Sequence, residues 1–165
     1  KLFSNLNSFA KNKIEELDFI FLLSTLIIDG TDNTDYFIYK FKISKKNQKR
    51  LKIIDDFYKA KMSSKSFSEN NLNRIFYFKG KQALIDILSF KIFTSRRIDK
   101  KILNLIKQFQ SKDIPIMPFG AKFLMEKYQI SEGKNLGIKL KSIEEEWVNN
   151  NFKLSDKQID KILSR

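Results

Sequence analysis

Cysteine and histidine are both absent from the 165 residues. Their absence excludes disulfides, zinc sites built from Cys or His, thiol nucleophiles and the Ser-His-Asp triad. Any catalysis would have to rest on carboxylates, Lys or Tyr. The chain also lacks a signal peptide and a long apolar run, since its longest apolar stretch, 19–28, is interrupted by Ser24 and Thr25. We therefore expect a soluble, cytoplasmic protein.

Interruptions of regular structure are scarce, because the chain has only five glycines and two prolines. Apolar residues recur at spacings of three and four along most of the sequence, which is typical of amphipathic helices. No alternating pattern is long enough to predict a strand, and no internal repeat of solenoid length is present. The 16 phenylalanines and a hydrophobic fraction of 42% are sufficient for a core. We predict an all-α fold, a bundle-like array of helices in two small subdomains.

Pro115 and Pro118 mark the main break in the helical pattern, because a proline removes a backbone donor and disfavours helix in the residue before it. We place a helical body at 1–112 and a helical tail at 113–165. In the body, the expected helices cover 14–28, a segment capped by Thr34 or Asp35, a segment after Ser44, segments on both sides of Gly80, and a segment after Ser95. In the tail they cover 121–128, 136–149 and 155–163. The polar loop 62–71 is a further candidate boundary.

No catalytic centre is visible in the sequence. The spacing of Asp29, Asp32 and Asp35 does not match a calcium-binding EF-hand loop, which needs a glycine at position 6 and a glutamate at position 12. An Asp-x-Asp pair, used by many nucleotidyltransferases to hold two metal ions, is absent, and so is a glycine-rich phosphate loop. We therefore predict no catalytic residue, no metal ligand and no cofactor site in this chain.

Positive charge is in large excess, with 32 Lys and Arg against 19 Asp and Glu and a net charge of +13. Such an excess favours a polyanionic partner or an anionic membrane surface. The basic residues form three groups: Lys45, Lys46, Lys49 and Arg50; Arg96, Arg97, Lys100 and Lys101; and Lys122, Lys127, Lys134, Lys139 and Lys141. They are interpreted either as contacts to nucleic-acid phosphates or as solvated helix faces, and the sequence leaves both interpretations open. The alternative function is a basic helical module that docks an acidic protein or a membrane surface.

Three short motifs follow one another in the tail: Ala121-Lys122-Phe123-Leu124-Met125, then Gly133-Lys134-Asn135-Leu136-Gly137, then Trp147-Val148 before Phe152. Their order and spacing resemble the C-terminal region of bacterial tRNA nucleotidyltransferases, the CCA-adding enzymes and their poly(A) polymerase relatives. Ala121 and Phe123 depart from the family pattern, which has glycine and aspartate at these places. Upstream, 41–51 and 83–88 are similar to other helices of the same family.

The resemblance implies part of an enzyme rather than a complete one. In the family, an N-terminal head holds the metal-binding carboxylates and selects CTP or ATP, with Mg²⁺, while the helical body and tail hold the tRNA. This chain contains nothing similar to the head, and it begins at Lys1 within helix-like sequence. We therefore expect the tRNA-binding part of a longer enzyme, with tRNA and its own catalytic head as partners. Whether the complete enzyme adds CCA, part of CCA or A tails stays open.

The residues expected to contact tRNA phosphates are Lys45, Lys46, Lys49, Arg50, Arg96, Arg97, Lys122 and Lys134. They would act through charge and shape rather than by reading the base sequence. Gly133, Gly137 and Trp147 are expected to form a structural motif, in which the glycines allow a tight turn before the long tail helix. The start of that helix, beside Lys134, also offers free N–H groups to a phosphate.

Overall fold

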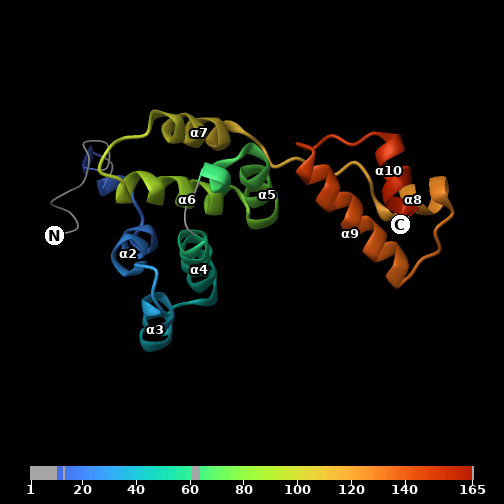
Figure 1. The fold of residues 1–165 in the computed structure, drawn as a ribbon. Coiled ribbons are helices and arrows are strands. Elements are labelled where there is room, and N and C mark those ends of the chain that lie inside the picture. Colours follow the sequence, from blue (N-terminus) through green and yellow to red (C-terminus); the bar gives the residue numbers. More distant parts are fainter. Residues whose placement is uncertain (1–10, 13, 61–63, 165) are drawn as a thin grey trace.

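The computed structural model of the protein describes residues 11–12, 14–60 and 64–164, and within these residues it contains helices and no strands (Figure 1). The body holds η2 (Ile14–Glu16), α2 (Phe19–Ile27), α3 (Asn33–Lys40), α4 (Lys45–Lys59), η3 (Ser64–Phe67), α5 (Glu69–Lys79), α6 (Lys81–Thr94) and α7 (Lys100–Ser111). The tail holds α8 (Ala121–Tyr128), α9 (Lys134–Asn149) and α10 (Asp156–Leu163). The predicted all-α class is confirmed.

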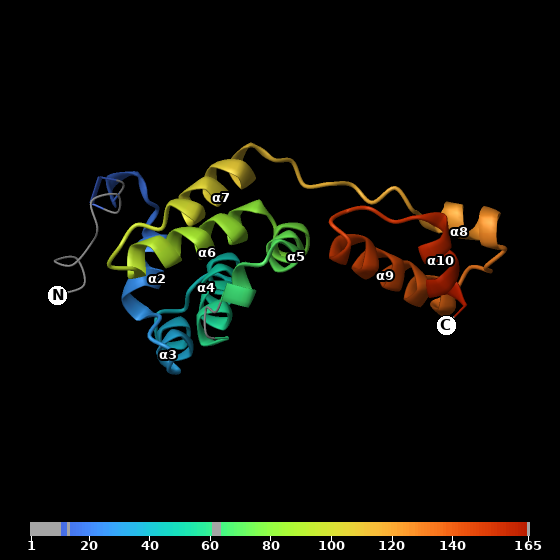
Figure 2. The same ribbon diagram turned by 45° about the horizontal axis from the view of Figure 1, so that its top comes forward.

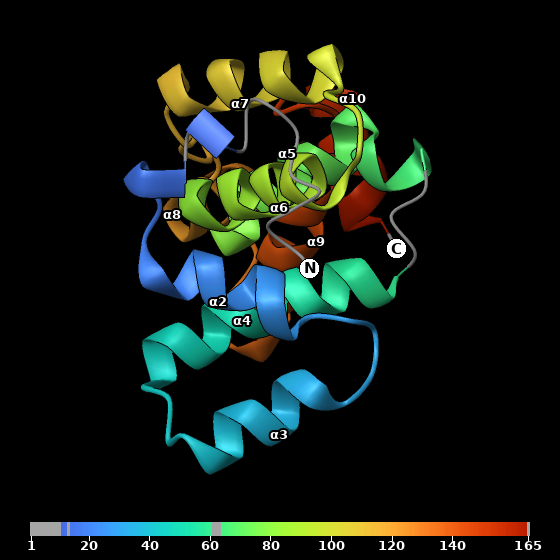
Figure 3. The ribbon, with the colours of Figure 1, turned by 90° about the vertical axis from the view of Figure 1, so that its left-hand side faces the viewer.

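Helix α6 lies at the centre of the body and packs against α2, α4, α5 and α7 (Figures 1 and 3). Its buried residues point to several sides of the helix, as expected for a helix enclosed by others. On one side, Phe90 joins a cluster with Phe21 of α2 and Leu51 of α4. On the other side, Leu88 joins a cluster of α5 and α7 side chains. The body is therefore two small cores that share one helix.

The tail helices surround a third cluster, formed by Leu124 of α8, Leu136 and Ile143 of α9, and Ile159 of α10. An extended segment that includes Pro115 and Pro118 connects α7 to α8, and it carries the tail beyond the α5 end of the body (Figure 2). A capping box, in which Ser155 and Gln158 bond reciprocally, fixes the start of α10.

The tail contacts the body chiefly through packing of α9 on α5. Trp147 is buried, and its ring lies 5.5 Å from the ring of Tyr77 and 5.0 Å from that of Phe152, both measured between centroids. The Tyr77 hydroxyl donates a hydrogen bond of 2.7 Å to Glu144. Partial burial and this carboxylate raise the pKa of Tyr77 to about 12, so Tyr77 stays protonated and keeps donating. Trp147, expected from the sequence only as part of a structural motif, thus joins two helices that are distant in sequence.

Several predicted helix ends are confirmed, including the break at Gly80 and the N-cap at Ser44. Two predictions for the body are wrong for the same physical reason. A helix over 14–28 was expected, but α2 begins only after Asp18, whose carboxylate accepts the Phe21 N–H at 3.1 Å. Similarly, α7 is capped by Asp99 rather than Ser95, because the Asp99 carboxylate accepts the Lys101 N–H.

The N-cap of α3 also differs from the prediction, because it is Asp32 rather than Thr34 or Asp35. Thr34 lies inside the helix and is buried, and Asp35 pairs with Lys52 of α4. The predicted boundary loop 62–71 overlaps residues 61–63, which lie outside the described part of the chain. From Ser64 onward the same segment contains η3 and the first turn of α5.

Arg50 of α4 connects three helices through its guanidinium group. Its Nε and Nη2 donate to the buried carboxylate of Asp86 in α6, at 2.5 and 2.8 Å. Its Nη1 and Nη2 donate to Asp18, the N-cap of α2, both at 2.7 Å. These bonds raise the pKa of Arg50. Partial burial opposes the ionisation of Asp18, but hydrogen bonds from Arg50 and Phe21 outweigh it and lower the pKa of Asp18.

This bridge is expected to be a large contributor to the free energy of unfolding. Replacing Arg50 by Met should destabilise the protein by about 3–5 kcal/mol, because the Asp86 carboxylate would stay buried without its cation. The double variant Arg50→Met/Asp86→Leu should recover at least half of that loss. Urea denaturation followed by circular dichroism measures both. Arg97→Met, at an exposed arginine, is the control and should change stability by less than about 0.5 kcal/mol. A loss below about 1 kcal/mol for Arg50→Met would contradict this role.

Candidate nucleic-acid interface

The outward face of α9 combines positive charge with an open backbone. Lys134, Gly137 and Lys141 are all exposed and follow one another at spacings of three and four residues, so they lie on one face. A methyl group added at Gly137 would meet no atom within 4 Å. The helix surface at Gly137 is therefore uncovered, with a lysine about one turn away on either side.

A groove of about 390 Å³ lies between α5 and α9 at the Lys141 end of this face. Arg74, Phe78 and Lys79 line it from α5, and Lys141 and Glu145 line it from α9. The guanidinium of Arg74 lies 5.6 Å from the centroid of the Phe78 ring, and its Nη1 donates to Asn149 at 2.8 Å. The ring of Phe78 is partly open to solvent. Arg74 is thus held in place by a ring and an amide, neither of which neutralises its charge.

We define the α5–α9 surface as Arg74, Phe78 and Lys79 of α5 together with Lys134, Gly137 and Lys141 of α9. Among the described residues, no carboxylate forms an ion pair with any of its four cations. Unpaired cations beside an exposed aromatic ring have the chemistry of a surface that binds nucleic acid, because cations contact phosphates and rings stack on bases. The groove lets both kinds of side chain meet the same ligand.

The structure does not bring the eight expected phosphate contacts together. Of these eight, only Lys134 belongs to the α5–α9 surface. Arg96 and Arg97 lie in the connection between α6 and α7, at the end of the body farthest from the tail (Figures 1 and 2). Lys122 lies on α8, where its Nζ is 3.7 Å from a Glu126 carboxylate oxygen.

Lys45, Lys46 and Lys49 form a separate basic surface in the first turns of α4. They are exposed, and α4 begins beside α3, where Tyr36, Tyr39 and Phe41 are also largely exposed (Figure 3). This surface shares the composition of the α5–α9 surface. It differs in that no hydrogen bond or ring contact within the described residues holds its three lysines in place.

Arg50, another of the expected phosphate contacts, is engaged by carboxylates of the protein itself. Its guanidinium is enclosed between Asp18 and Asp86, so its charge is already neutralised within the protein. A phosphate would have to compete with the half-exposed carboxylate of Asp18, while the buried carboxylate of Asp86 holds the other side of the guanidinium. Two further lysines of the tail also have partners within the protein, of which only the partner of Lys127 carries a charge. Lys127 pairs with Asp156 at 3.0 Å, and the Nζ of Lys139 donates to the carbonyl of Leu163.

Arg74, Phe78 and Lys79 were not identified from sequence, because they lie in the segment 73–79, which reads as an apolar helix. A signal was present in that segment. Phe76, Tyr77 and Phe78 are consecutive, and a helix spreads three consecutive residues over about 200° of its circumference, so one core cannot bury all three rings. Phe76 is fully buried, Tyr77 contacts the tail, and Phe78 remains exposed.

The two glycines expected to shape the start of α9 differ in their backbones. Gly133 is the N-cap and has φ +147°, in the region that favours glycine. Gly137 lies inside the helix, has no positive φ and has no close neighbour. The positive φ that a glycine-dependent turn requires is thus present at Gly133 and absent at Gly137.

Alanine substitution should separate these two glycines. Gly133→Ala is expected to lower the free energy of unfolding by about 1–3 kcal/mol, because alanine is strained at this φ. Gly137→Ala should raise it by about 0.5–1 kcal/mol, because alanine favours the helix and the space is open. Thermal and urea denaturation measure both changes. A destabilising Gly137→Ala would show that the helix interior needs this glycine.

Within the described residues, no group of three or more Asp and Glu side chains is placed to hold a metal ion. No helix among the same residues has both the length and the apolar character that crossing a membrane requires. Searches of protein-family models, of curated proteins and of solved structures find no match to this chain.

Proposed function

We propose that this chain binds tRNA, as the C-terminal part of a tRNA nucleotidyltransferase that adds CCA to tRNA 3′ ends. The observation that carries the proposal is the α5–α9 surface, in which three cations without an ion pair among the described residues, Arg74, Lys79 and Lys141, and an exposed ring line a groove, with Lys134 further along α9. The tail motifs that resemble this enzyme family supply Lys134 and the exposed Gly137.

The surface favours recognition of an RNA backbone over recognition of a base sequence. Lys79, Lys134 and Lys141 carry flexible ammonium groups, which suit phosphates in many positions. Lys134 and Lys141 are seven residues apart on α9 and therefore about 10 Å apart along its axis. That separation allows them to contact different phosphates of one strand. Gly137 lies between them and leaves room for the sugar-phosphate backbone to approach the helix.

The remaining expected contacts take a secondary part in the proposal. Lys45, Lys46, Lys49, Arg96, Arg97 and Lys122 are exposed but lie on other faces of the molecule. They would steer the RNA by long-range attraction and would add contacts where a long RNA extends past the α5–α9 surface. Nucleotide addition itself would belong to a head domain outside these residues, which would bring Mg²⁺, CTP and ATP.

Three triple variants with equal loss of charge test this assignment. They are Lys79→Ala/Lys134→Ala/Lys141→Ala, Lys45→Ala/Lys46→Ala/Lys49→Ala, and Arg96→Ala/Arg97→Ala/Lys100→Ala. Binding of labelled tRNA is measured from about 50 to 200 mM salt. The first variant should weaken binding at least about tenfold and reduce the slope of log K against log salt by about 2. The other two should lose less affinity.

Competitors decide what kind of partner the surface prefers. tRNA binding that survives an excess of duplex DNA of similar length supports the proposal. If all three variants lose the same amount of tRNA affinity and DNA competes as well as tRNA does, binding depends only on net charge. That result would contradict the proposal. Binding to anionic vesicles or to an acidic protein, with no binding to tRNA, would instead favour the docking-module alternative.

A further inference from the structure

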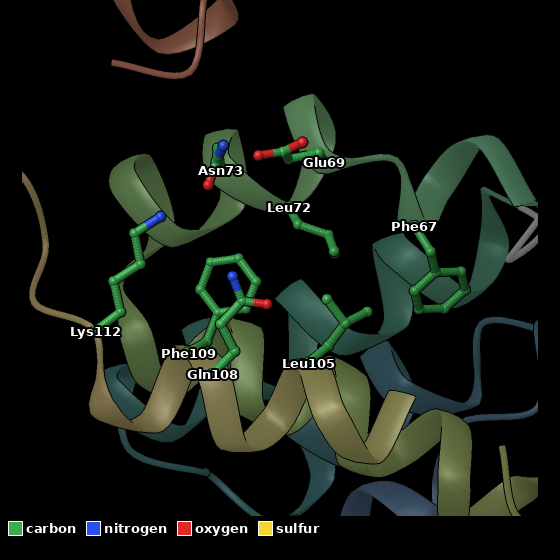
Figure 4. A pocket seen from close by; sticks show the side chains of 8 residues that line it. All are labelled: Phe67, Glu69, Leu72, Asn73, Leu105, Gln108, Phe109 and Lys112. Atoms are coloured by element: carbon green, nitrogen blue, oxygen red, sulfur yellow. The ribbon is translucent and has the colours of Figure 1, made fainter. Parts of the chain in front are cut away.

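A second cavity lies on the other side of α5, where η3, α5 and α7 meet. We refer to it as the α5–α7 pocket, and its volume is about 310 Å³. Leu72, Leu105 and Phe109 form its apolar part, with Phe67 at one end. Figure 4 shows Glu69 and Asn73 on the α5 side of this pocket, opposite Gln108 and Lys112 on the α7 side. A pocket of this size with a few converging polar groups is typical of a small-molecule site.

Asn73 supplies a buried hydrogen-bond acceptor that has no partner in the described part of the chain. Its side chain is almost fully buried, and its Nδ2 donates to Asn151 of the tail at 2.9 Å. Its Oδ1 is buried and accepts no hydrogen bond from any residue that the structure describes. Leaving a buried acceptor unsatisfied costs about 1–3 kcal/mol, so a ligand that brought a donor to Oδ1 would recover that free energy.

Lys112 supplies a cation that contacts aromatic rings, among them the ring of Phe109 in the pocket wall. Its Nζ lies 5.5 Å from the ring centroids of Phe109 and Phe152 and 5.9 Å from that of Phe76. No carboxylate within the described residues pairs with it. Ring faces stabilise an ammonium group but leave its N–H donors available. Lys112 is therefore positioned at the pocket as an unpaired cation that is open to an anion.

Glu69 adds a negative charge to a pocket that also contains the positive charge of Lys112. Its carboxylate reaches the pocket from the first turn of α5 and has no ion-pair partner among the described residues. A purely apolar ligand would leave both charges unsatisfied, and a simple anion would be repelled by Glu69. The pocket therefore favours a ligand with three parts: a flat apolar body for the rings, a hydrogen-bond donor for Glu69 and Asn73, and an anion for Lys112.

We propose that the α5–α7 pocket binds a nucleotide whose base carries an exocyclic amino group. The base would lie against Leu105 and Phe109, its amino group would donate to Glu69 and to the Oδ1 of Asn73, and Lys112 would contact its phosphate. Adenine and cytosine carry such an amino donor, whereas uracil presents an acceptor at the corresponding position. Gln108 can donate to or accept from other base edges.

The nucleotide can come from the bound RNA or from solution. The RNA source rests on the proposed function, and the layout of α5 supports it. Asn73 of the pocket and Arg74 of the α5–α9 surface are adjacent residues, and both bond to the tail, at Asn151 and Asn149 respectively. An RNA held at the α5–α9 surface would therefore have neighbouring unpaired nucleotides near the α5–α7 pocket.

The first test uses free nucleotides with the ¹⁵N-labelled chain. In NMR titrations, AMP and CMP should shift the side-chain amide signals of Asn73 and Gln108, whereas UMP and ribose 5-phosphate should bind about tenfold more weakly. Leu105→Trp fills the pocket and should abolish these shifts. Asn104→Trp, at the adjacent exposed position of α7, is the matched control and should leave them unchanged.

Lys112→Met gives a second variant, which keeps the apolar stem of the side chain and removes its charge. It should weaken AMP about tenfold while leaving adenosine unchanged, because only the phosphate loses a partner. Thermal melts of each variant establish that it is folded. If Lys112→Met affects AMP and adenosine equally, the assigned orientation of the nucleotide is wrong.

Measuring tRNA binding by the same variants shows whether the nucleotide comes from the RNA or from solution. It also tests the pocket proposal separately from the proposed function. Weaker tRNA binding by Leu105→Trp than by Asn104→Trp would identify the RNA as the source, and equal tRNA binding with loss of AMP would identify a free nucleotide. If no nucleotide shifts the two amides and Leu105→Trp binds tRNA like the wild type, the pocket proposal fails. The α5–α9 lysine variant can still weaken tRNA in that case, which would leave the proposed function standing. If AMP binds but tRNA does not, the pocket proposal stands and the proposed function fails.

Discussion

The packing of Trp147 against Tyr77 is the contact on which both candidate binding sites depend. It holds α9 on α5, and α9 supplies Lys134 and Lys141 to the α5–α9 surface. The same contact brings Phe152 toward Lys112 and Asn151 toward Asn73, so it also completes the α5–α7 pocket. Aromatic pairs contribute about 0.5–1.5 kcal/mol beyond their buried area. Here they also fix the position of charges that neither subdomain could arrange alone.

Charge has two separate roles in this protein, and burial decides which role a cation takes. Arg50 is enclosed by carboxylates and links α2, α4 and α6, so it contributes to the architecture of the body. Arg74 is held by a ring and a neutral amide, so its charge remains available to a partner. Both are arginines on amphipathic helices. The difference lies in the groups that hold the guanidinium, which are two carboxylates at Arg50 and a ring with a neutral amide at Arg74.

Sequence reasoning succeeded where the information was local. The tail helices and the break at Gly80 follow from apolar spacing and turn chemistry, and the structure confirms them. Asp18 and Asp99 were missed as caps because an Asp inside helical sequence looks like surface charge until its backbone partner is known. The partners of Arg50 are 32 and 36 residues away, so no local pattern distinguishes it from Lys49. The exposure of Phe78 and the unsatisfied Oδ1 of Asn73 likewise depend on how the tail docks.

The extended connection between α7 and α8 keeps the tail attached to the body, so docking of α9 on α5 and its separation from α5 are intramolecular steps. Residues 112–120 can span at most about 30 Å, and Pro115 and Pro118 restrict their conformations. A short, stiff tether gives the tail a high effective concentration at α5. Separation of the two parts is then a local opening with a smaller free energy than global unfolding. A ligand that contacts both α5 and α9 shifts this equilibrium toward the state in which the two helices are packed together. Its apparent affinity therefore depends on the fraction of molecules that are already in that state.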